Sequence, residues 1–260
     1  MSIQNESKIN KLLQKWPKNT VALYKWMRPH GISRQLADKY VKTGWLKRIG
    51  SGAYIRTGDN VDIFGAIYAL QEHGKLPVHP AGKTALQLKG YVHFIPAGLK
   101  QNTVTLFGDI NTKLPAWFTD YSRRAGLRYV STGLFKNDAS LGLSDYDTGN
   151  FVIQISSPER AILEMCYGIP EHESYGELDY IMQSLNTLRP DALMDLLSAC
   201  GSIKAKRLFM HMAEKHAHAW VNKLNLKNVN FGTGSRQLYK NGSFDGKYRI
   251  VVPRPEPGNE

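Results

Sequence analysis

Apolar residues recur at helical spacing near the start of the chain. The first set predicts a helix that stops at Pro17, since proline cannot continue a helix: Ile9, Leu12, Leu13 and Trp16. The second set predicts a short helix that Asn19 or Thr20 caps and that ends before Pro29: Val21, Leu23, Tyr24 and Met27. Two short helices are therefore expected before Gly31.

A third helix is expected after Ser33, whose side chain suits an N-cap. Its apolar side carries Leu36, Ala37, Tyr40 and Val41, and its polar side carries Gln35, Asp38, Lys39 and Lys42, with Arg34 on the flank of the first turn. A helix, a tight turn and a helix with a polar outward face are typical of a helix-turn-helix, whose second helix reads the major groove.

A hairpin is expected after this helix. The segments 45–49 and 53–56 are rich in β-prone residues and flank Gly50-Ser51-Gly52, a turn that tolerates positive φ. This hairpin would be the wing of a winged helix-turn-helix.

The distribution of charge supports a polyanion as the partner of this region. Residues 1–56 hold 12 Lys or Arg and 2 Asp or Glu, residues 57–200 hold 11 and 16, and residues 201–260 hold 11 and 4, within a chain of net charge +12. Phosphates attract such a basic module, and their neutralisation releases counterions. A solvated basic surface, or a basic three-helix module that binds another protein, is the alternative.

Side-chain geometry divides the predicted DNA contacts into two groups. Arg34 and Gln35 are expected at base edges, because Arg suits guanine and Gln suits adenine. The other side chains are expected on phosphates, where they add affinity without sequence information: Lys39, Lys42, Lys47, Arg48 and Ser51.

The rest of the chain mixes helices and strands without regular alternation, so the predicted fold class is α+β. Helices are expected at 62–72, 82–88, 158 onward, 175–188, 191–199 and 203–224, and strands at 76–79, 103–107 and 151–155. Ser157, Pro158 and Glu159 are a strong helix start. A hairpin is expected between 238–239 and 248–252.

Three sequence features in this region indicate a chemical site only weakly. Lys83 and Thr84 follow a glycine but lack the upstream glycine spacing of a P-loop. His211, His216 and His218 suggest zinc, yet they do not share a helix face, so a packed or solvated face is favoured. The segment 232–236 could cradle a phosphate, although a structural turn is the more common reading. No paired-carboxylate, nucleophile-elbow or metal motif is present, so we expect no catalytic residue, metal or cofactor.

Cys166 and Cys200 are expected to be reduced and buried. No apolar run approaches a membrane span and the first residues are polar, so we expect a cytoplasmic protein.

Four segments in this order resemble the AbiEi-type antitoxins of bacterial abortive-infection toxin-antitoxin systems: GWLKRIGSGAYIR, VHPAGKTALQLKGY, ISSPERAILEM and GTGSRQLYKNGSFDGKYRIVVP. The resemblance implies a winged helix at 1–57 and an antitoxin domain at 58–252. Residues 253–260 have no apolar content to fold around, so a loose tail is expected there. It also implies binding of double-stranded DNA at inverted repeats of the protein's own promoter. The functional partner would be a nucleotidyltransferase-like toxin, counteracted without a stable complex, as part of phage defence.

The resemblance extends the DNA contacts to 34–42 and 47–54, which adds Tyr54 to the set. In the antitoxin domain it implies motif positions without a defined chemistry: His79, Lys83, Ser157, Glu159, Arg160 and Arg236. Helix capping is the preferred reading of Ser157 and Glu159. Two other functions stay open, namely a winged-helix regulator whose larger domain binds a small effector, and a nucleic-acid-modifying enzyme.

Overall fold

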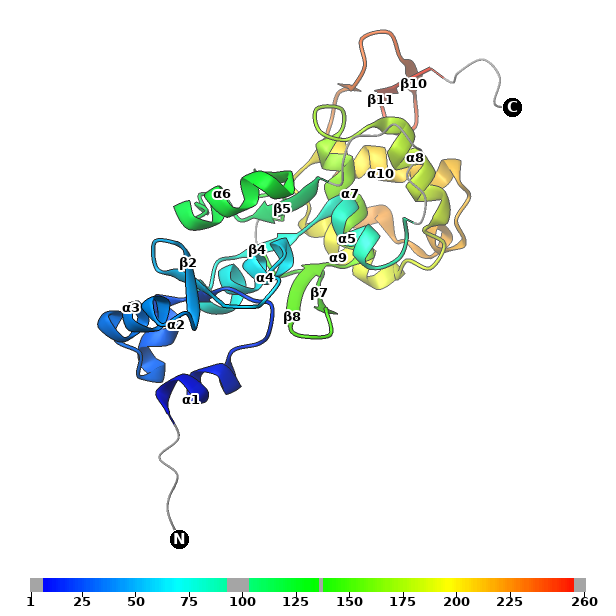
Figure 1. The fold of residues 1–260 in the computed structure, drawn as a ribbon. Helices are drawn as coiled ribbons and strands as arrows, with labels where there is room; N and C mark the ends of the chain where they lie inside the picture. The colour runs from blue at the N-terminus through cyan, green and yellow to red at the C-terminus, as the bar shows by residue number, and fades with distance from the viewer. Residues whose placement is uncertain (1–6, 93–102, 136–137, 255–260) are drawn as a thin grey trace. The chain divides into compact units, whose positions relative to one another are not determined.

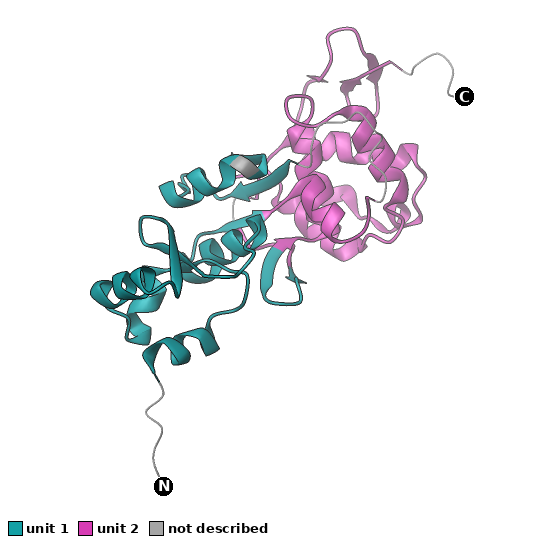
Figure 2. Cartoon of the chain, viewed as in Figure 1, with its two compact units in different colours: residues 1–79, 100–132, 145–154 teal, residues 80–99, 133–144, 155–260 magenta. Residues whose placement is uncertain are grey.

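The computed structural model describes residues 7–92, 103–135 and 138–254 and has a mixed α+β fold. The chain forms two compact units (Figure 2). Unit 1 comprises residues 1–79, 100–132 and 145–154, and unit 2 comprises residues 80–99, 133–144 and 155–260. The predicted boundary at residue 57 lies inside unit 1, and of the predicted tail, residues 255–260 lie outside the described residues.

The elements up to residue 131 follow one another along the chain (Figure 1). They are α1 (Lys8–Lys15), β1 (Ala22–Leu23), α2 (Tyr24–Met27), η1 (Arg28–His30), α3 (Arg34–Lys42), β2 (Leu46–Gly50), β3 (Ala53–Arg56), α4 (Ile63–Tyr68), the π-helix η2 (Ala69–His73), β4 (Val78–Pro80), α5 (Gly82–Leu88), β5 (Val104–Gly108), α6 (Ala116–Ser122), η3 (Arg123–Ala125) and β6 (Leu127–Ser131). Of these, α5 belongs to unit 2.

The first and third predicted helices are confirmed, and the second begins later than expected. Ala22 and Leu23 are not helical, because they pair antiparallel with Tyr54 and Ala53 and complete a sheet of order β1-β3-β2. The helix therefore starts at Tyr24. The turn before α3 places Gly31 at φ 81°, a left-handed conformation that favours glycine.

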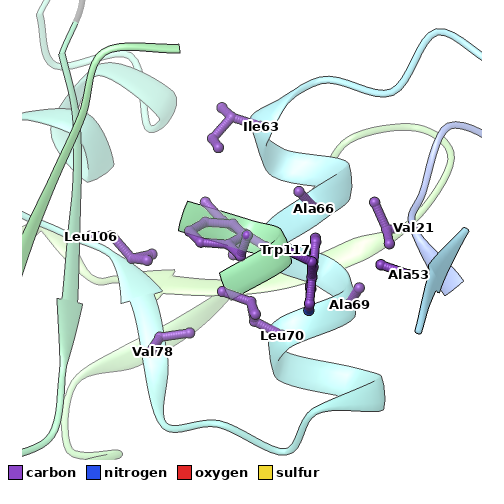
Figure 3. Packing of buried hydrophobic residues seen from close by; sticks show 11 residues of the cluster. Val21, Ala53, Ile63, Ala66, Ala69, Leu70, Val78, Leu106 and Trp117 are labelled. Carbon is purple, nitrogen blue, oxygen red and sulfur yellow. The ribbon is translucent and has the colours of Figure 1, made fainter. Parts of the chain in front are cut away.

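Two apolar clusters hold unit 1 together. One packs α1 and α3 around Trp16, Met27, Ile32 and Leu46. The other joins Val21 and Ala53 to side chains from much later in the chain (Figure 3): Ile63, Ala66, Ile67, Ala69, Leu70, Val78, Leu106, Trp117 and Phe118. The N-terminal hairpin thus shares a core with α4, α6 and the sheet β4-β5-β6.

Gly50 shows how close this packing is. A Cβ added to Gly50 of β2 would lie 2.6 Å from the Cβ of Trp117 in α6. Only glycine allows the hairpin to approach α6 in this way.

The later elements are β7 (Leu143–Asp147), β8 (Val152–Ser156), α7 (Pro158–Gly168), α8 (Tyr175–Ser184), α9 (Pro190–Ala199), α10 (Ile203–Lys215), η4 (Ala219–Lys223), η5 (Leu226–Asn228), β9 (Arg236–Gln237), β10 (Ser243–Asp245) and β11 (Ile250–Val252). The predicted helix start at Ser157 and the bounds of α5 are confirmed. Cys166 and Cys200 are free and buried, as expected.

Three predictions in this part were wrong. The helix expected over 175–188 ends at Ser184. The helix expected over 203–224 ends at Lys215. Two residues later, Ala217 takes φ 49°, which is not a helical conformation. The break lets two buried rings reach backbone carbonyls: the His218 ring nitrogen lies 2.7 Å from the Met182 oxygen, and the Trp220 indole donates to Leu185. The C-terminal hairpin was expected to pair 238–239 with 248–252. Its first strand is instead β10, which pairs antiparallel with β11, while β9 runs parallel to β11.

Candidate nucleic-acid interface

Helix α3 presents a polar face to solvent. Ser33 accepts a hydrogen bond from the Leu36 amide and caps the helix, and Ala37 is buried in the first cluster of unit 1. The predicted contact residues on the other face are exposed: Arg34, Gln35, Lys39 and Lys42. The Arg34 guanidinium lies 5.3 Å from the Tyr24 ring centroid, so an aromatic face supports it at the start of the helix.

Arg48 of β2 is connected to α3. Its guanidinium forms an ion pair with Asp38 and donates to the Tyr54 hydroxyl at 3.2 Å, and it lies 5.4 Å from the Tyr54 ring centroid. Tyr54 is 4% exposed and packs in the first cluster. Its ring therefore supports Arg48, and the part of Tyr54 that could touch an outside molecule is small.

The hairpin presents its remaining polar groups at the turn and along β2. Lys47 and Ser51 are exposed, and Gly52 has φ 68°. The strand register shifts between Arg48 and Gly50, so Ile49 is a bulge residue. Bulges strengthen the local twist and change the direction of a strand, here just before the turn.

Sequence reasoning did not identify two features of the hairpin region, namely the exposure of Trp45 and the position of Arg56 against an aromatic ring. Trp45, just before β2, is 51% exposed. Arg56 of β3 lies inside unit 1 with its guanidinium 5.3 Å from the Trp16 ring centroid, and burial lowers its pKa. A basic side chain in a sequence gives no signal that it is buried against an aromatic ring.

The motif residues of unit 2 are mostly engaged in structural contacts. Arg160 of α7 pairs with Glu164 at 2.8 Å and donates to the carbonyls of Ala139 and Leu141. Glu164, which is also buried, accepts from Ser156 and from the Gly82 amide at 2.9 Å. The carboxylate of Glu164 therefore accepts the hydrogen bond of the amide at the start of α5, the position at which a P-loop would bind a phosphate.

The other motif residues follow the same pattern. Ser157 accepts from the Arg160 amide and caps α7, while Glu159 accepts from the backbone and the guanidinium of Arg189. Although burial disfavours its charged form, these hydrogen bonds lower the pKa of Glu159. Lys83 pairs with Glu177 at 2.5 Å. His79 belongs to unit 1, where it is buried with its ring centroid 6.4 Å from that of Phe107.

The loop 232–236 is held from within unit 2. Arg207 of α10 is buried and donates to the carbonyls of Phe231, Gly232, Gly234 and Arg249. The loop carbonyls thus face a guanidinium of the same chain. Arg236, at the end of the loop, is exposed and donates to the carbonyl of Ser235.

The three histidines of the zinc alternative have separate partners. His211 lies between Asp245 at 2.6 Å and the Tyr175 hydroxyl at 3.0 Å, and His216 contacts Asp179 at 2.8 Å. His218 reaches the Met182 carbonyl. Within the described ranges, no group of three His, Cys, Asp or Glu residues could hold a metal ion, and no helix is long and apolar enough to cross a membrane.

Comparison with known proteins covers nearly the whole chain. Residues 5–97 match a family described as "Transcriptional regulator, AbiEi antitoxin N-terminal domain", and residues 101–253 match "Transcriptional regulator, AbiEi antitoxin, Type IV TA system". The fold is similar to the crystal structure of the RV2827C protein from Mycobacterium tuberculosis, with a TM-score of 0.59 and 13% identity over 95% of this chain and 91% of that chain. No curated protein matches the sequence.

Proposed function

Because this chain belongs to the AbiEi antitoxin transcriptional regulators of type IV toxin-antitoxin systems, we propose that it is a cytoplasmic antitoxin that represses its own operon. It binds inverted repeats of double-stranded promoter DNA through an N-terminal winged helix. The observation that carries this proposal is the exposed basic face of α3 beside an exposed, basic hairpin.

The proposed winged helix consists of α1, the pair α2 and η1, the turn at Gly31, α3, and the hairpin β2-β3 with β1. In this arrangement α3 is the recognition helix and enters the major groove with its N-terminal turn. Arg34 and Gln35 lie in that turn and read base edges. Lys39 and Lys42, farther along α3, bind phosphates and set the register.

The hairpin supplies the wing contacts. Lys47 and Ser51 are exposed and bind phosphates directly. Arg48 contributes a half-exposed guanidinium whose orientation Asp38 and Tyr54 fix, so Tyr54 acts through Arg48.

The test is a titration of the full-length protein against its own promoter and a shuffled sequence of equal composition, at two salt concentrations. We expect the protein to bind the promoter more tightly than the shuffled sequence. The double variant Lys39→Ala with Lys42→Ala loses about 1–3 kcal/mol of binding free energy on both DNAs. The matched control replaces Lys223 and Lys227, two exposed lysines of unit 2, and leaves binding unchanged. Equal affinity for promoter and shuffled DNA would contradict the proposal.

We propose that residues 58–252 counteract a nucleotidyltransferase-like toxin without forming a stable complex with it. Co-expression of toxin and full-length antitoxin from unrelated promoters tests this division of labour. The variant lacking the α3 lysines retains growth rescue, and the two proteins do not co-purify. Loss of rescue in that variant, or a stable complex, would show that the division is wrong.

A further inference from the structure

The C-terminal sheet of unit 2, of order β10-β11-β9, turns one face toward α10. Ile250 of β11 is fully buried, and the carboxylate of its partner in register, Asp245 of β10, lies 2.6 Å from the ring nitrogen Nδ1 of His211 in α10. Because successive side chains of a strand alternate between faces, the neighbouring pair Phe244 and Val251 lies on the opposite face. Phe244 is 57% exposed, so this opposite face, the open face, presents an aromatic ring to solvent.

Gln237 of β9 continues the row on the open face, because it pairs in register with Val251 on the other side of β11. The Gln237 side chain is exposed, and its nitrogen donates to the carbonyls of Tyr239 at 3.4 Å and Lys240 at 3.3 Å. These contacts use the donor end of the amide and leave its oxygen as an acceptor. The open face therefore combines an aromatic ring with a hydrogen-bond acceptor.

The chain around this sheet is strongly basic. Residues 217–254 hold 7 Lys or Arg and 1 Asp or Glu. The single acidic residue is Asp245, whose carboxylate is turned toward His211 on the other face. Within the described residues, Lys247 is the basic side chain of this segment that forms an ion pair, with Glu214 at 2.6 Å. The positive charge of the segment is thus mostly available to an outside anion.

Arg249, directly before β11, provides a guanidinium whose backbone is fixed. Its carbonyl accepts from the Arg236 amide at 2.9 Å and from the buried Arg207 guanidinium at 3.1 Å, while the side chains of Arg249 and Arg236 are exposed. Burial, and then the positive charges of Arg236 and Arg249, lower the pKa of Arg207. Three like charges therefore act on one another here, and an anion beside Arg249 would offset their repulsion.

We propose that the open face of this sheet binds single-stranded nucleic acid. An unpaired base stacks on the Phe244 ring, the Gln237 oxygen accepts an N–H of a base, and Arg249 binds a phosphate. Aromatic side chains on an exposed sheet bind RNA bases in this way. The bases of a duplex are stacked on one another and cannot reach the ring. This site lies in unit 2 and does not depend on the duplex site proposed for unit 1.

The composition of the open face favours a nucleic acid over a protein partner. Phe244 is the one large hydrophobic residue that the described part of this sheet exposes. The centre of a protein interface buries several apolar side chains and is depleted of charged residues. Stacking of a base needs a single ring, and the neighbouring guanidinium groups add affinity for phosphate.

The experiment measures the fluorescence anisotropy of two labelled probes with the full-length protein. One probe is a short uridine RNA, and the other is an RNA chain of equal length in which every base is missing. The two probes carry the same phosphates and differ only in the bases. We expect the uridine RNA to bind about tenfold more tightly than the abasic chain, because stacking of one base contributes this difference.

Substitutions of Phe244 identify the ring as the stacking group. Phe244→Ala lowers the affinity for uridine RNA about tenfold and leaves the affinity for the abasic chain unchanged. Phe244→Leu has the same effect, because leucine is apolar but cannot stack, and Phe244→Trp retains the affinity. Tyr180→Ala, at a 54% exposed position of α8, is the matched control and leaves the binding of both probes unchanged.

Arg249→Gln tests the phosphate contact. It weakens the binding of both probes about three- to tenfold and lowers the salt slope by about 0.7, the value for one phosphate of a single strand. Equal affinity of the unmodified protein for the two probes, or unchanged binding of uridine RNA in Phe244→Ala, would overturn the proposal. Unchanged binding in Phe244→Leu would overturn it too, and would indicate that the face makes apolar contact with a protein instead.

Discussion

Arg48 of β2 forms an ion pair with Asp38 of α3, and both side chains are about half exposed, at 49% and 52%. Asp38 is the one acidic residue in the sequence of α3. The pair ties the hairpin to the proposed recognition helix and offsets part of the positive charge of this surface.

The first prediction concerns this pair. Asp38→Asn removes the charge that competes with phosphate for Arg48, so DNA affinity rises about three- to tenfold at low salt, for promoter and shuffled DNA alike, and the salt slope steepens by about one. Because the pair is exposed and screened by solvent, we expect little change in the free energy of unfolding. Anisotropy titrations at several salt concentrations measure both effects, with Asp191→Asn in α9 as control. An unchanged salt slope would show that Arg48 does not reach phosphate.

The second prediction separates base reading from phosphate binding on α3. Arg34→Ala reduces the preference for promoter over shuffled DNA by about 1–3 kcal/mol, because the side chain is placed at a base edge. Lys42→Ala weakens binding to both DNAs equally and lowers the salt slope by about one. Competition titrations with both DNAs decide between the two effects. If both variants behave alike, the proposed docking of α3 is incorrect.

The third prediction concerns the buried pair of α7. Arg160→Met removes the guanidinium that pairs with the carboxylate of Glu164, whose side chain is fully buried, and destabilises the protein by about 3–5 kcal/mol. Arg189→Met removes a 67% exposed side chain from Glu159, which keeps the hydrogen bond from the Arg189 amide, and the loss is about 1–2 kcal/mol. Urea unfolding measures both.

A second variant keeps this prediction testable if Arg160→Met does not fold. The double change Arg160→Met with Glu164→Met removes both charges and recovers part of the lost stability. A double variant that is no more stable than Arg160→Met alone would contradict the ion-pair explanation.

These buried pairs show where sequence reasoning succeeds and where it stops. Ser33 and Ser157 were identified as helix caps because a cap depends on neighbours a few residues away. The contacts of Glu164 with Gly82, and of Arg207 with the loop 232–236, join segments far apart in the chain. Local patterns do not encode such partners, so the sequence indicated a motif at Arg160 without showing that it is structural.

The same reason explains where the fold predicted from the sequence was wrong. Ala22 and Leu23 match a helical pattern, but pairing with β3 determines their conformation. The basic face of α3 was predictable because its periodicity is local. The pocket of unit 1 that Ile49, Ile63 and Tyr121 line was not predictable, since its lining joins β2, α4 and α6.

The fourth prediction concerns the pH dependence of stability. His73 of η2 stacks on Trp26 at 4.5 Å between ring centroids, and burial, followed by the charges of Lys75 and His30, lowers its pKa to about 4. Between that value and the unfolded value near 6.5, the unfolded chain binds more protons than the folded chain. The stabilisation is complete above about pH 6.5 and decreases by up to about 3 kcal/mol as the pH falls to 4.

His73→Phe tests this effect because it retains a ring on Trp26 and cannot be protonated. Chemical unfolding at several pH values between 4 and 7 should show a flatter profile for this variant than for the unmodified protein. His172→Phe, at an exposed position, leaves the profile unchanged. A parallel profile for His73→Phe would assign the pH dependence to other groups.

The last prediction separates the two arginines at the loop 232–236. Arg207 is buried and holds the loop through its carbonyls, whereas Arg236 is exposed and donates a hydrogen bond within the loop itself, to the carbonyl of Ser235. Arg207→Met therefore lowers the free energy of unfolding by about 3 kcal/mol, because the carbonyls of Phe231, Gly232, Gly234 and Arg249 lose a charged donor. Arg236→Ala changes stability by less than about 0.5 kcal/mol, as expected for an exposed position. If Arg236 takes part in counteracting the toxin, growth rescue falls in Arg236→Ala at unchanged protein level, and Lys240→Ala, at a nearby exposed position, retains full rescue. Full rescue by Arg236→Ala would limit the role of this loop to the fold of unit 2.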